Sequence, residues 1–292
     1  MRTKPEGFDK RLAYSIDMLQ RGERLARSLA DDGYYLAFSG GKDSQALYHV
    51  AKLAGVRFSA HYSVTTIDPP ELVRFIRGYY PDVAFELPEH GFFALCIKKR
   101  MLPTMQVRFC CEKLKEVAGY GHLTLTGVRR EESWRRSRRC EIELQSRRKD
   151  AAFSGDLSQF DEFSMQRELE GVRCVGGRDK LVMNPILYWS FRDVWYFLRE
   201  VVKVEYCTLY DQGNTRLGCM FCPMETRRGL LQAAERYPKY YRLMLRTIAR
   251  LREDGYMMAY PNLTDEEVFH WWASKQNIKE WYSINKQQGK LF

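Results

Sequence analysis

The chain has 292 residues and a hydrophobic fraction of 45%, enough for one large core or for one core and a smaller appendage. It contains no run of about 18 apolar residues and no apolar segment behind its charged start, so we expect neither a membrane span nor a secretory signal, and a cytoplasmic protein. The formal net charge of +10 favours a polyanionic partner or substrate.

Helical and strand patterns alternate along the chain up to about residue 200. An amphipathic helix is predicted over residues 8–31. Short apolar segments typical of strands lie at 34–38, 56–64, 82–87, 123–128 and 181–186. Helices are predicted at 45–53, 71–79 and 190–198, the last with a capping box between Ser190 and Asp193. This alternation predicts an α/β fold with a doubly wound, mostly parallel sheet.

The turn after the first strand is rich in glycine. It consists of Ser39, Gly40, Gly41, Lys42, Asp43 and Ser44. The glycines permit a tight turn and a close backbone approach, and we expect Asp43 or Ser44 to cap the next helix. Backbone N–H groups at the positive end of a helix favour phosphate. The adjacent glycines exclude the usual P-loop, which needs four residues between them.

The turn resembles the pyrophosphate loop of the adenine nucleotide α-hydrolase superfamily, which includes ATP pyrophosphatases, tRNA-thiolating enzymes and sulfonucleotide (PAPS/APS) reductases. This resemblance implies binding of ATP, or of a PAPS- or APS-like nucleotide, together with Mg²⁺. Lys42 is expected to neutralise phosphate charge, with a solvent-facing side chain as the alternative. Asp43 and Asp68 are expected to hold magnesium or position substrate, and the alternative for both is a cap or turn residue.

A basic segment follows the strand predicted at 123–128. Gly127, Arg129 and Arg130 stand at its end, where open α/β sheets bind ligands, and guanidinium groups suit phosphate or sulfate oxygens. Lys42, Asp43 and Arg129 are therefore the candidate catalytic residues. The alternative is a solvated basic loop braced by acidic neighbours.

The cysteines fall into local pairs. Eight are present, and disulfides are not expected in the cytoplasm. Cys110-Cys111 and Cys219-x-x-Cys222, taken in order with the glycine turn and with residues 127–133, resemble the PAPS reductase-like family over residues 10–224. Within that family the pairs resemble the branch that binds a 4Fe-4S cluster, and Cys140 is a rival ligand. Zinc accepts the same donors, and small buried hydrophobic residues are the alternative without metal.

The last part of the chain is predicted to be a helical extension. We place a nucleotide-binding domain that includes the cysteines at 1–224 and a helical region at 225–292. An apolar face carries Tyr241, Leu245, Ile248 and Leu251. Another face carries Lys239, Arg242, Arg246 and Arg250, which we interpret as a solvated stripe with polyanion contact as the alternative. Residues 150–178 are polar and indicate an excursion or mobile loop.

One departure from the family guides the functional prediction. Its reductases carry a nucleophilic cysteine in a Glu-Cys-Gly-like segment near the C-terminus, whereas the last cysteine here is Cys222. We therefore favour an ATP pyrophosphatase that adenylates an acceptor, followed by sulfur transfer to nucleic acid (tRNA or DNA) or to a small molecule, with a sulfur-donor protein as partner. The alternatives are a PAPS or APS reductase and a non-catalytic nucleotide- and nucleic-acid-binding subunit.

Overall fold

The computed structural model describes residues 3–116, 118–145, 154–155, 180–257 and 261–287. Contacts group the chain into two compact units. The first unit comprises residues 1–63, 70–86 and 117–217, and the second unit comprises residues 64–69, 87–116 and 218–292. The sequence predicted one boundary, between residues 224 and 225. That boundary concerns domains that fold independently, and it stays a prediction.

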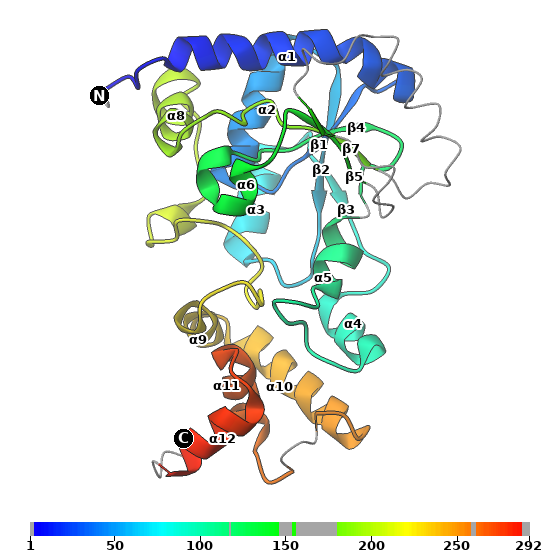
Figure 1. The fold of residues 1–292 in the computed structure, drawn as a ribbon, viewed down its shortest axis with the longest axis vertical. Coiled ribbons are helices and arrows are strands. Elements are labelled where there is room, and N and C mark those ends of the chain that lie inside the picture. The colour runs from blue at the N-terminus through cyan, green and yellow to red at the C-terminus, as the bar shows by residue number, and fades with distance from the viewer. Residues whose placement is uncertain (1–2, 117, 146–153, 156–179, 258–260, 288–292) are drawn as a thin grey trace. The chain divides into compact units, whose positions relative to one another are not determined.

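A mixed sheet forms the centre of the first unit (Figure 1). Its described strands run in the order β3-β2-β1-β4-β7-β5-β6. Their bounds are β1 Tyr34–Ala37, β2 Phe58–Ser63, β3 Ala84–Glu86, β4 Leu123–Leu125, β5 Ile142–Gln145, β6 Ser154–Gly155 and β7 Lys180–Met183. The pairs β1–β2, β2–β3, β1–β4 and β4–β7 are parallel, while β5 is antiparallel to both β7 and β6. The predicted α/β class with a mostly parallel sheet is confirmed.

The helices of the first unit are α1 Phe8–Leu29, α2 Lys42–Ala54, α3 Pro70–Tyr79, α6 Trp134–Ser137 and α8 Phe191–Tyr196, with 3-10 turns at Arg130–Glu132 and Thr208–Tyr210 and a π-helical turn at Phe197–Val201. Helices α1 and α2 pack together, and α1 also contacts β1 and β4. The predicted capping box of α8 is confirmed. The Asp193 amide donates to Ser190 Oγ at 3.1 Å, and the Ser190 amide donates to Asp193 Oδ2 at 2.6 Å.

Strands β4 and β7 each end three residues earlier than the sequence suggested. β4 ends at Leu125 and β7 at Met183, because the chain leaves the ladder after the Thr126 amide bonds the Met183 carbonyl at 3.0 Å. The antiparallel strand β5 was not predicted, since its short apolar alternation lies inside a strongly charged segment. The excursion predicted at 150–178 lies outside the described residues except for β6.

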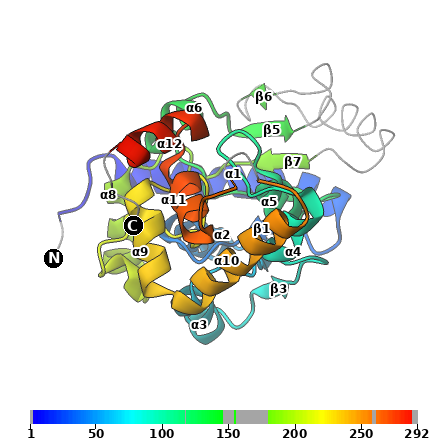
Figure 2. The same ribbon diagram turned by 90° about the horizontal axis from the view of Figure 1, so that it is seen from below.

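The second unit is helical (Figure 2). Its helices are α4 Phe92–Lys99, α5 Phe109–Cys111, α9 Arg227–Arg236, α10 Pro238–Glu253, α11 Asp265–Ser274 and α12 Ile278–Gln287, and a π-helical segment covers Glu112–Glu116. Helix α10 packs against α4, α9 and α11. The unit has its own core, whose largest fully buried side chains include Phe92, Phe221, Phe269 and Trp281.

Helix α10 has the two faces expected from its pattern. Ile248 and Leu251 are fully buried, and Tyr241 and Leu245 pack against the same core. The cationic stripe of Lys239, Arg242, Arg246 and Arg250 is exposed. Among the described helices, none combines the length and apolar composition that a membrane crossing requires.

Candidate functional site

The order of the strands changes direction at β1. This strand pairs with β2 on one side and with β4 on the other, both in parallel. The loops that follow β1 and β4 therefore leave the same edge of the sheet from two adjacent strands. Open α/β sheets bind ligands in the crevice outside such a switch point.

The loop after β1 fits only glycine at residue 40. Gly40 has φ +70°, and a β-carbon there would lie 2.7 Å from the side-chain ends of both Leu72 and Ile76 on α3. The hydroxyl of Ser44 closes the loop, since it accepts from the Ser39 amide at 3.1 Å and donates to the Gly41 carbonyl at 2.9 Å. The loop is thus held by its own side chains.

Helix α2 begins without a side-chain cap. Gly41 occupies the N-cap position and the helix starts at Lys42, so the prediction that Asp43 or Ser44 caps it is wrong. The reason is that the Ser44 hydroxyl is already engaged with the loop. Within the described part of the chain, the amides of Gly40, Asp43 and Ser44 donate to no protein acceptor. These donors lie at or beside the positive end of a helix, where an anion is favoured.

The three predicted catalytic side chains meet beside this helix end. Asp43 Oδ2 lies 2.8 Å from Lys42 Nζ, and Asp43 Oδ1 accepts from Arg129 Nε at 2.7 Å. Lys42 is 4% exposed and Arg129 is 3% exposed, which excludes the solvent-facing interpretation of Lys42 and the solvated-loop interpretation of Arg129. One carboxylate therefore holds two buried cations.

Acidic residues after β4 fix the position of Arg129. Its Nη1 donates to Glu131 Oε2 at 2.9 Å and to the Trp189 carbonyl at 3.3 Å. Its own amide donates to Glu132 Oε2 at 3.1 Å. Glu131 also accepts from the Phe191 amide at the start of α8. The guanidinium is thereby oriented before any ligand arrives.

Gly127 brings the second loop against the first. A β-carbon at this position would lie 3.0 Å from the Asp43 carbonyl carbon and oxygen and 3.1 Å from the Ser44 amide nitrogen. Those neighbours are backbone atoms that cannot turn aside, so glycine is needed for the close approach. That Gly127 contacts a bound ligand stays a prediction.

Arg130 points elsewhere. Its Nε donates to the Arg139 carbonyl at 3.0 Å, and its guanidinium lies 4.8 Å from the centre of the Tyr188 ring. None of its described contacts is with the glycine loop. Asp68 belongs to the second unit, where its Oδ2 accepts from the Thr65 amide at 2.7 Å, so its described bond is that of a turn residue.

Four of the predicted ligand cysteines belong to the second unit, and their thiols are free. The hydrogen bond between Cys110 and Cys111 raises the pKa of the Cys110 thiol and lowers that of Cys111. Burial raises the pKa of Cys222. Cys140 lies in the first unit, where its amide donates to Glu143 Oε1 at 2.7 Å.

Lys115 interacts with this cysteine group. Desolvation of its amine lowers its pKa, but the negative charges of Cys219, Asp68 and Cys111 outweigh this and raise it. Lys115 is an exposed residue, and its charge partners decide the direction in which its pKa shifts. Among the described residues, no three His, Cys, Asp or Glu side chains are arranged to hold a metal ion. The thiols interact electrostatically, since Cys110 and Cys222 each interact with Cys219 and Cys111, and thiolates have the right chemistry for iron–sulfur or zinc.

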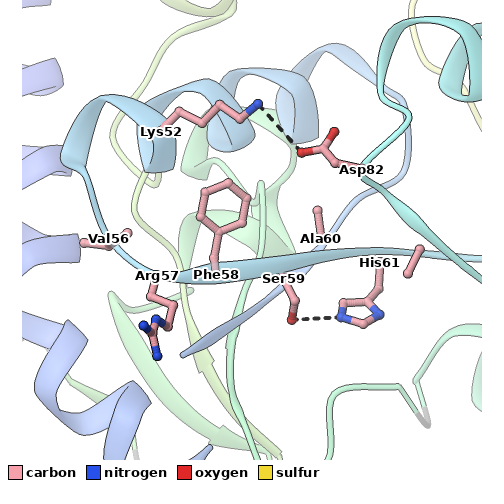
Figure 3. A pocket seen from close by; sticks show the side chains of 9 residues that line it. Lys52, Val56, Arg57, Phe58, Ser59, Ala60, His61 and Asp82 are labelled. Atoms are coloured by element: carbon pink, nitrogen blue, oxygen red, sulfur yellow. Dashed lines mark hydrogen bonds and ion pairs between the residues drawn. The ribbon is translucent and has the colours of Figure 1, made fainter. Parts of the chain in front are cut away.

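A cavity of about 490 Å³ lies elsewhere on the first unit, along β2 and the end of α2 (Figure 3). Its lining includes none of the predicted site residues. Its polar side chains are already paired: Lys52 lies 3.7 Å from Asp82, and Ser59 Oγ lies 2.9 Å from His61 Nε2. We assign it no ligand.

Sequence reasoning missed Tyr210 at the loop. The Lys42 amide donates to Tyr210 Oη at 2.8 Å, although 168 residues separate them. Nothing in the local pattern around residue 210 marks this contact. It also missed the role of Lys115 beside the cysteines, although that lysine stands in the same motif.

The sheet order and the loop at its switch point place the chain in the adenine nucleotide α-hydrolase class of α/β proteins. Residues 33–225 match the phosphoadenosine phosphosulfate reductase domain, and the chain belongs to this enzyme family. An uncharacterized protein of Methanocaldococcus jannaschii is 25% identical over 229 residues, which cover 75% of this chain and 48% of that protein. The chain thus spans about half the length of the curated relatives it matches.

Solved structures with a similar fold have low sequence identity. Candida glabrata FMN adenylyltransferase aligns with a TM-score of 0.48 and 14% identity, covering 75% of this chain and 65% of that one. The phosphoadenylyl-sulfate (PAPS) reductase of Candida auris aligns with a TM-score of 0.45 and 15% identity, covering 76% of this chain and 98% of that one.

Proposed function

We propose that the protein binds ATP, or a related adenylyl nucleotide, at residues 39–44 and adenylates an acceptor with release of pyrophosphate. The observation that carries this proposal is the set of unengaged amides at the start of α2, beside the buried Lys42–Asp43–Arg129 group. Family membership supports an adenine nucleotide as the ligand.

The proposed reaction forms a bond between an acceptor oxygen and the α-phosphorus, while the bond from that phosphorus to the β-phosphate oxygen breaks. Pyrophosphate takes the electron pair, and the acceptor gives up its proton. The protein's contribution is positioning and neutralisation of charge. The amides of Asp43 and Ser44 hold phosphate oxygens, and Lys42 adds a buried positive charge.

Arg129 supplies the second positive charge. Its Nη2 makes no hydrogen bond to the described residues, whereas Nε and Nη1 are engaged. That free nitrogen is the donor we assign to the nucleotide. Because Asp43 is already paired with two cations, we expect Mg²⁺ to arrive bound to the nucleotide phosphates rather than to a preformed protein site.

The finer part of the proposal is sulfur transfer to the adenylated acceptor, with nucleic acid as the acceptor class. A sulfur-donor protein supplies a sulfide-level nucleophile, which forms the new bond to the acceptor while AMP leaves with the acceptor oxygen and the electron pair. The positive charge and the four cysteines of the second unit support this transfer. Thiolates suit a 4Fe-4S cluster, with zinc as the alternative. Among the described residues no group of three ligands is in place, so we assign no step of the reaction to a metal. We propose a cytoplasmic location as well, where thiols stay reduced.

Pyrophosphate release from ATP, measured with tRNA, DNA or FMN as candidate acceptor, tests the proposal. Release that depends on an acceptor and disappears in Gly41→Val is expected. ATP affinity without any release would instead indicate a non-catalytic binding subunit. The family name favours a second candidate, a PAPS or APS reductase, which predicts sulfite release from those nucleotides with a thiol donor.

A further inference from the structure

Tyr210 contacts the glycine turn where helix α2 begins. Its hydroxyl oxygen accepts the Lys42 amide at 2.8 Å, and a β-carbon built on Gly41 would lie 3.5 Å from the same oxygen. The hydroxyl is therefore on the side of the Gly41–Lys42 backbone where a side chain would project. The proposed function places a phosphate near the same stretch of backbone, because the unengaged amides of Asp43 and Ser44 come next in the chain.

The tyrosine is held firmly in this position. It closes the 3-10 turn Thr208–Tyr210, and its amide donates to the Cys207 carbonyl at 3.1 Å. Its ring packs edge-on against Trp195, with centroids 5.1 Å apart at 87°. The ring of Tyr206 lies on the same cluster, 6.3 Å from that of Tyr210. The hydroxyl is thus placed by packing and not only by its bond to Lys42.

The proton of this hydroxyl is unused. A phenol donates one hydrogen bond, and within the described residues the Tyr210 hydroxyl only accepts. Burial raises the pKa of Tyr210, so the proton stays on the oxygen at neutral pH. An amide at a helix start that donates to the oxygen polarises the O–H bond and strengthens it as a donor. Phosphate oxygens are acceptors, so the two groups are complementary.

We propose that Tyr210 is a phosphate-binding residue of the nucleotide site, whose hydroxyl takes the Lys42 amide and donates its own proton to a phosphate oxygen. This inference rests on the proposed function, because it assumes that an adenine nucleotide binds at the loop. Tyr210, 168 residues away from Lys42, thus adds one side-chain donor to the backbone amides of the turn.

The alternative role for Tyr210 is to block the site: its hydroxyl would act as a plug that occupies the position of a phosphate oxygen at the Lys42 amide. The two roles predict opposite changes in phosphate affinity when the hydroxyl is removed. Removal of a donor weakens phosphate binding, whereas removal of a plug frees the Lys42 amide and strengthens it. Tyr210→Phe keeps the ring and its contact with Trp195 and deletes only the hydroxyl.

The experiment is calorimetric titration of ATP and of inorganic pyrophosphate into the full chain. The variants are Tyr210→Phe, the matched control Tyr206→Phe and Tyr210 replaced by 3-fluorotyrosine. Tyr206 belongs to the same ring cluster, but its hydroxyl lies 3.1 Å from Asp211 Oδ1. We expect about tenfold weaker binding of both ligands to Tyr210→Phe, the order expected for one lost hydrogen bond to a charged group. The control should match the natural protein.

The fluorinated residue keeps the hydroxyl and makes it a stronger donor, so it should bind both ligands more tightly than the natural residue. It also keeps the inference testable if Tyr210→Phe does not fold. Equal or tighter binding to Tyr210→Phe, or weaker binding to the fluorinated protein, overturns the role of Tyr210 and leaves the nucleotide site standing. Failure of the natural protein to bind either ligand overturns the proposed function and the inference together.

Discussion

Arg129 Nε and Asp43 Oδ1 are joined by a 2.7 Å hydrogen bond across a sequence separation of 86 residues. The pair ties the loop after β4 to the start of α2. Both the arginine and Lys42, which shares the same carboxylate, are almost wholly buried. A buried charge that loses its partner is costly, since neither water nor a counter-ion replaces it.

Arg129→Ala should therefore destabilise the protein by about 1 to 3 kcal/mol, because the hydrogen bonds to Asp43 and Glu131 are lost while Asp43 keeps Lys42 as a partner. Arg135→Ala is the matched control, because Arg135 is an exposed arginine a few residues further on and should change stability by less than about 0.5 kcal/mol. Denaturant unfolding of both variants measures the difference. Equal stabilities would contradict a structural role for the Asp43–Arg129 bond.

The two loop glycines should respond differently to substitution. Gly40→Ala should lower the stability, because the residue has φ +70° and a β-carbon would overlap Leu72 and Ile76. Gly41→Val should fold, since a β-carbon at 41 makes only contacts of 3.4 and 3.5 Å, but it should lose ATP affinity because it covers the loop amides. Thermal unfolding and calorimetry separate the effects. Unchanged ATP affinity in folded Gly41→Val would remove the loop as the nucleotide site.

The cysteines of the second unit should bind a metal when the protein is prepared without oxygen. Cys219→Ser and Cys222→Ser should each lose iron and sulfide, because a cubane needs four thiolates. Cys140→Ser tests the rival ligand: the metal should stay if Cys110, Cys111, Cys219 and Cys222 form the set, and it should be lost if Cys140 is a member. Metal analysis and a visible spectrum are the measurements. A colourless protein with one zinc per chain would favour zinc, and a metal-free one would leave the thiols as buried apolar groups.

Nucleic acid binding should depend on the exposed stripe of α10. Reversing Arg242 and Arg246 to glutamate should flatten the log–log salt dependence of tRNA binding by about 0.7 to 0.9 per lost phosphate contact. Arg250→Glu should have a smaller effect, because Arg250 already lies 3.3 Å from Asp254. ATP affinity is the internal control. Absence of tRNA and DNA binding at about 50 mM salt would make the stripe a solvated surface.

His49 should make the protein less stable in mild acid. Burial, aided by Lys52, lowers its pKa from 6.5 to about 4 in the folded state. Between these values the unfolded chain takes up a proton that the folded chain refuses, so stability falls as the pH drops below 6.5. His49→Gln should remove about 1 kcal/mol of the difference between pH 7 and pH 5, after discounting for partial exposure. Unfolding curves at both pH values test this, and identical pH dependence would contradict it.

Features that depend on neighbouring residues could be predicted from the sequence. The apolar segment at 34–38, the two glycines and the helical spacing after them were enough to predict strand, turn and helix. The cap was misassigned because a serine at a helix start usually caps it, whereas Ser44 bonds back to Ser39. Tyr210 was unpredictable, since only the folded chain distinguishes it from the other members of a set of 18 tyrosines.

The second unit is built from three separate segments of the chain. Its segment 64–69 lies between β2 and α3, its segment 87–116 lies between β3 and β4, and its third segment follows residue 217. Helix α10 in that third segment packs against α4 in the second. A peptide of residues 225–292 would therefore expose half of a core. The unit is therefore not one continuous module, and a graft of it onto another sheet would require three coordinated insertions.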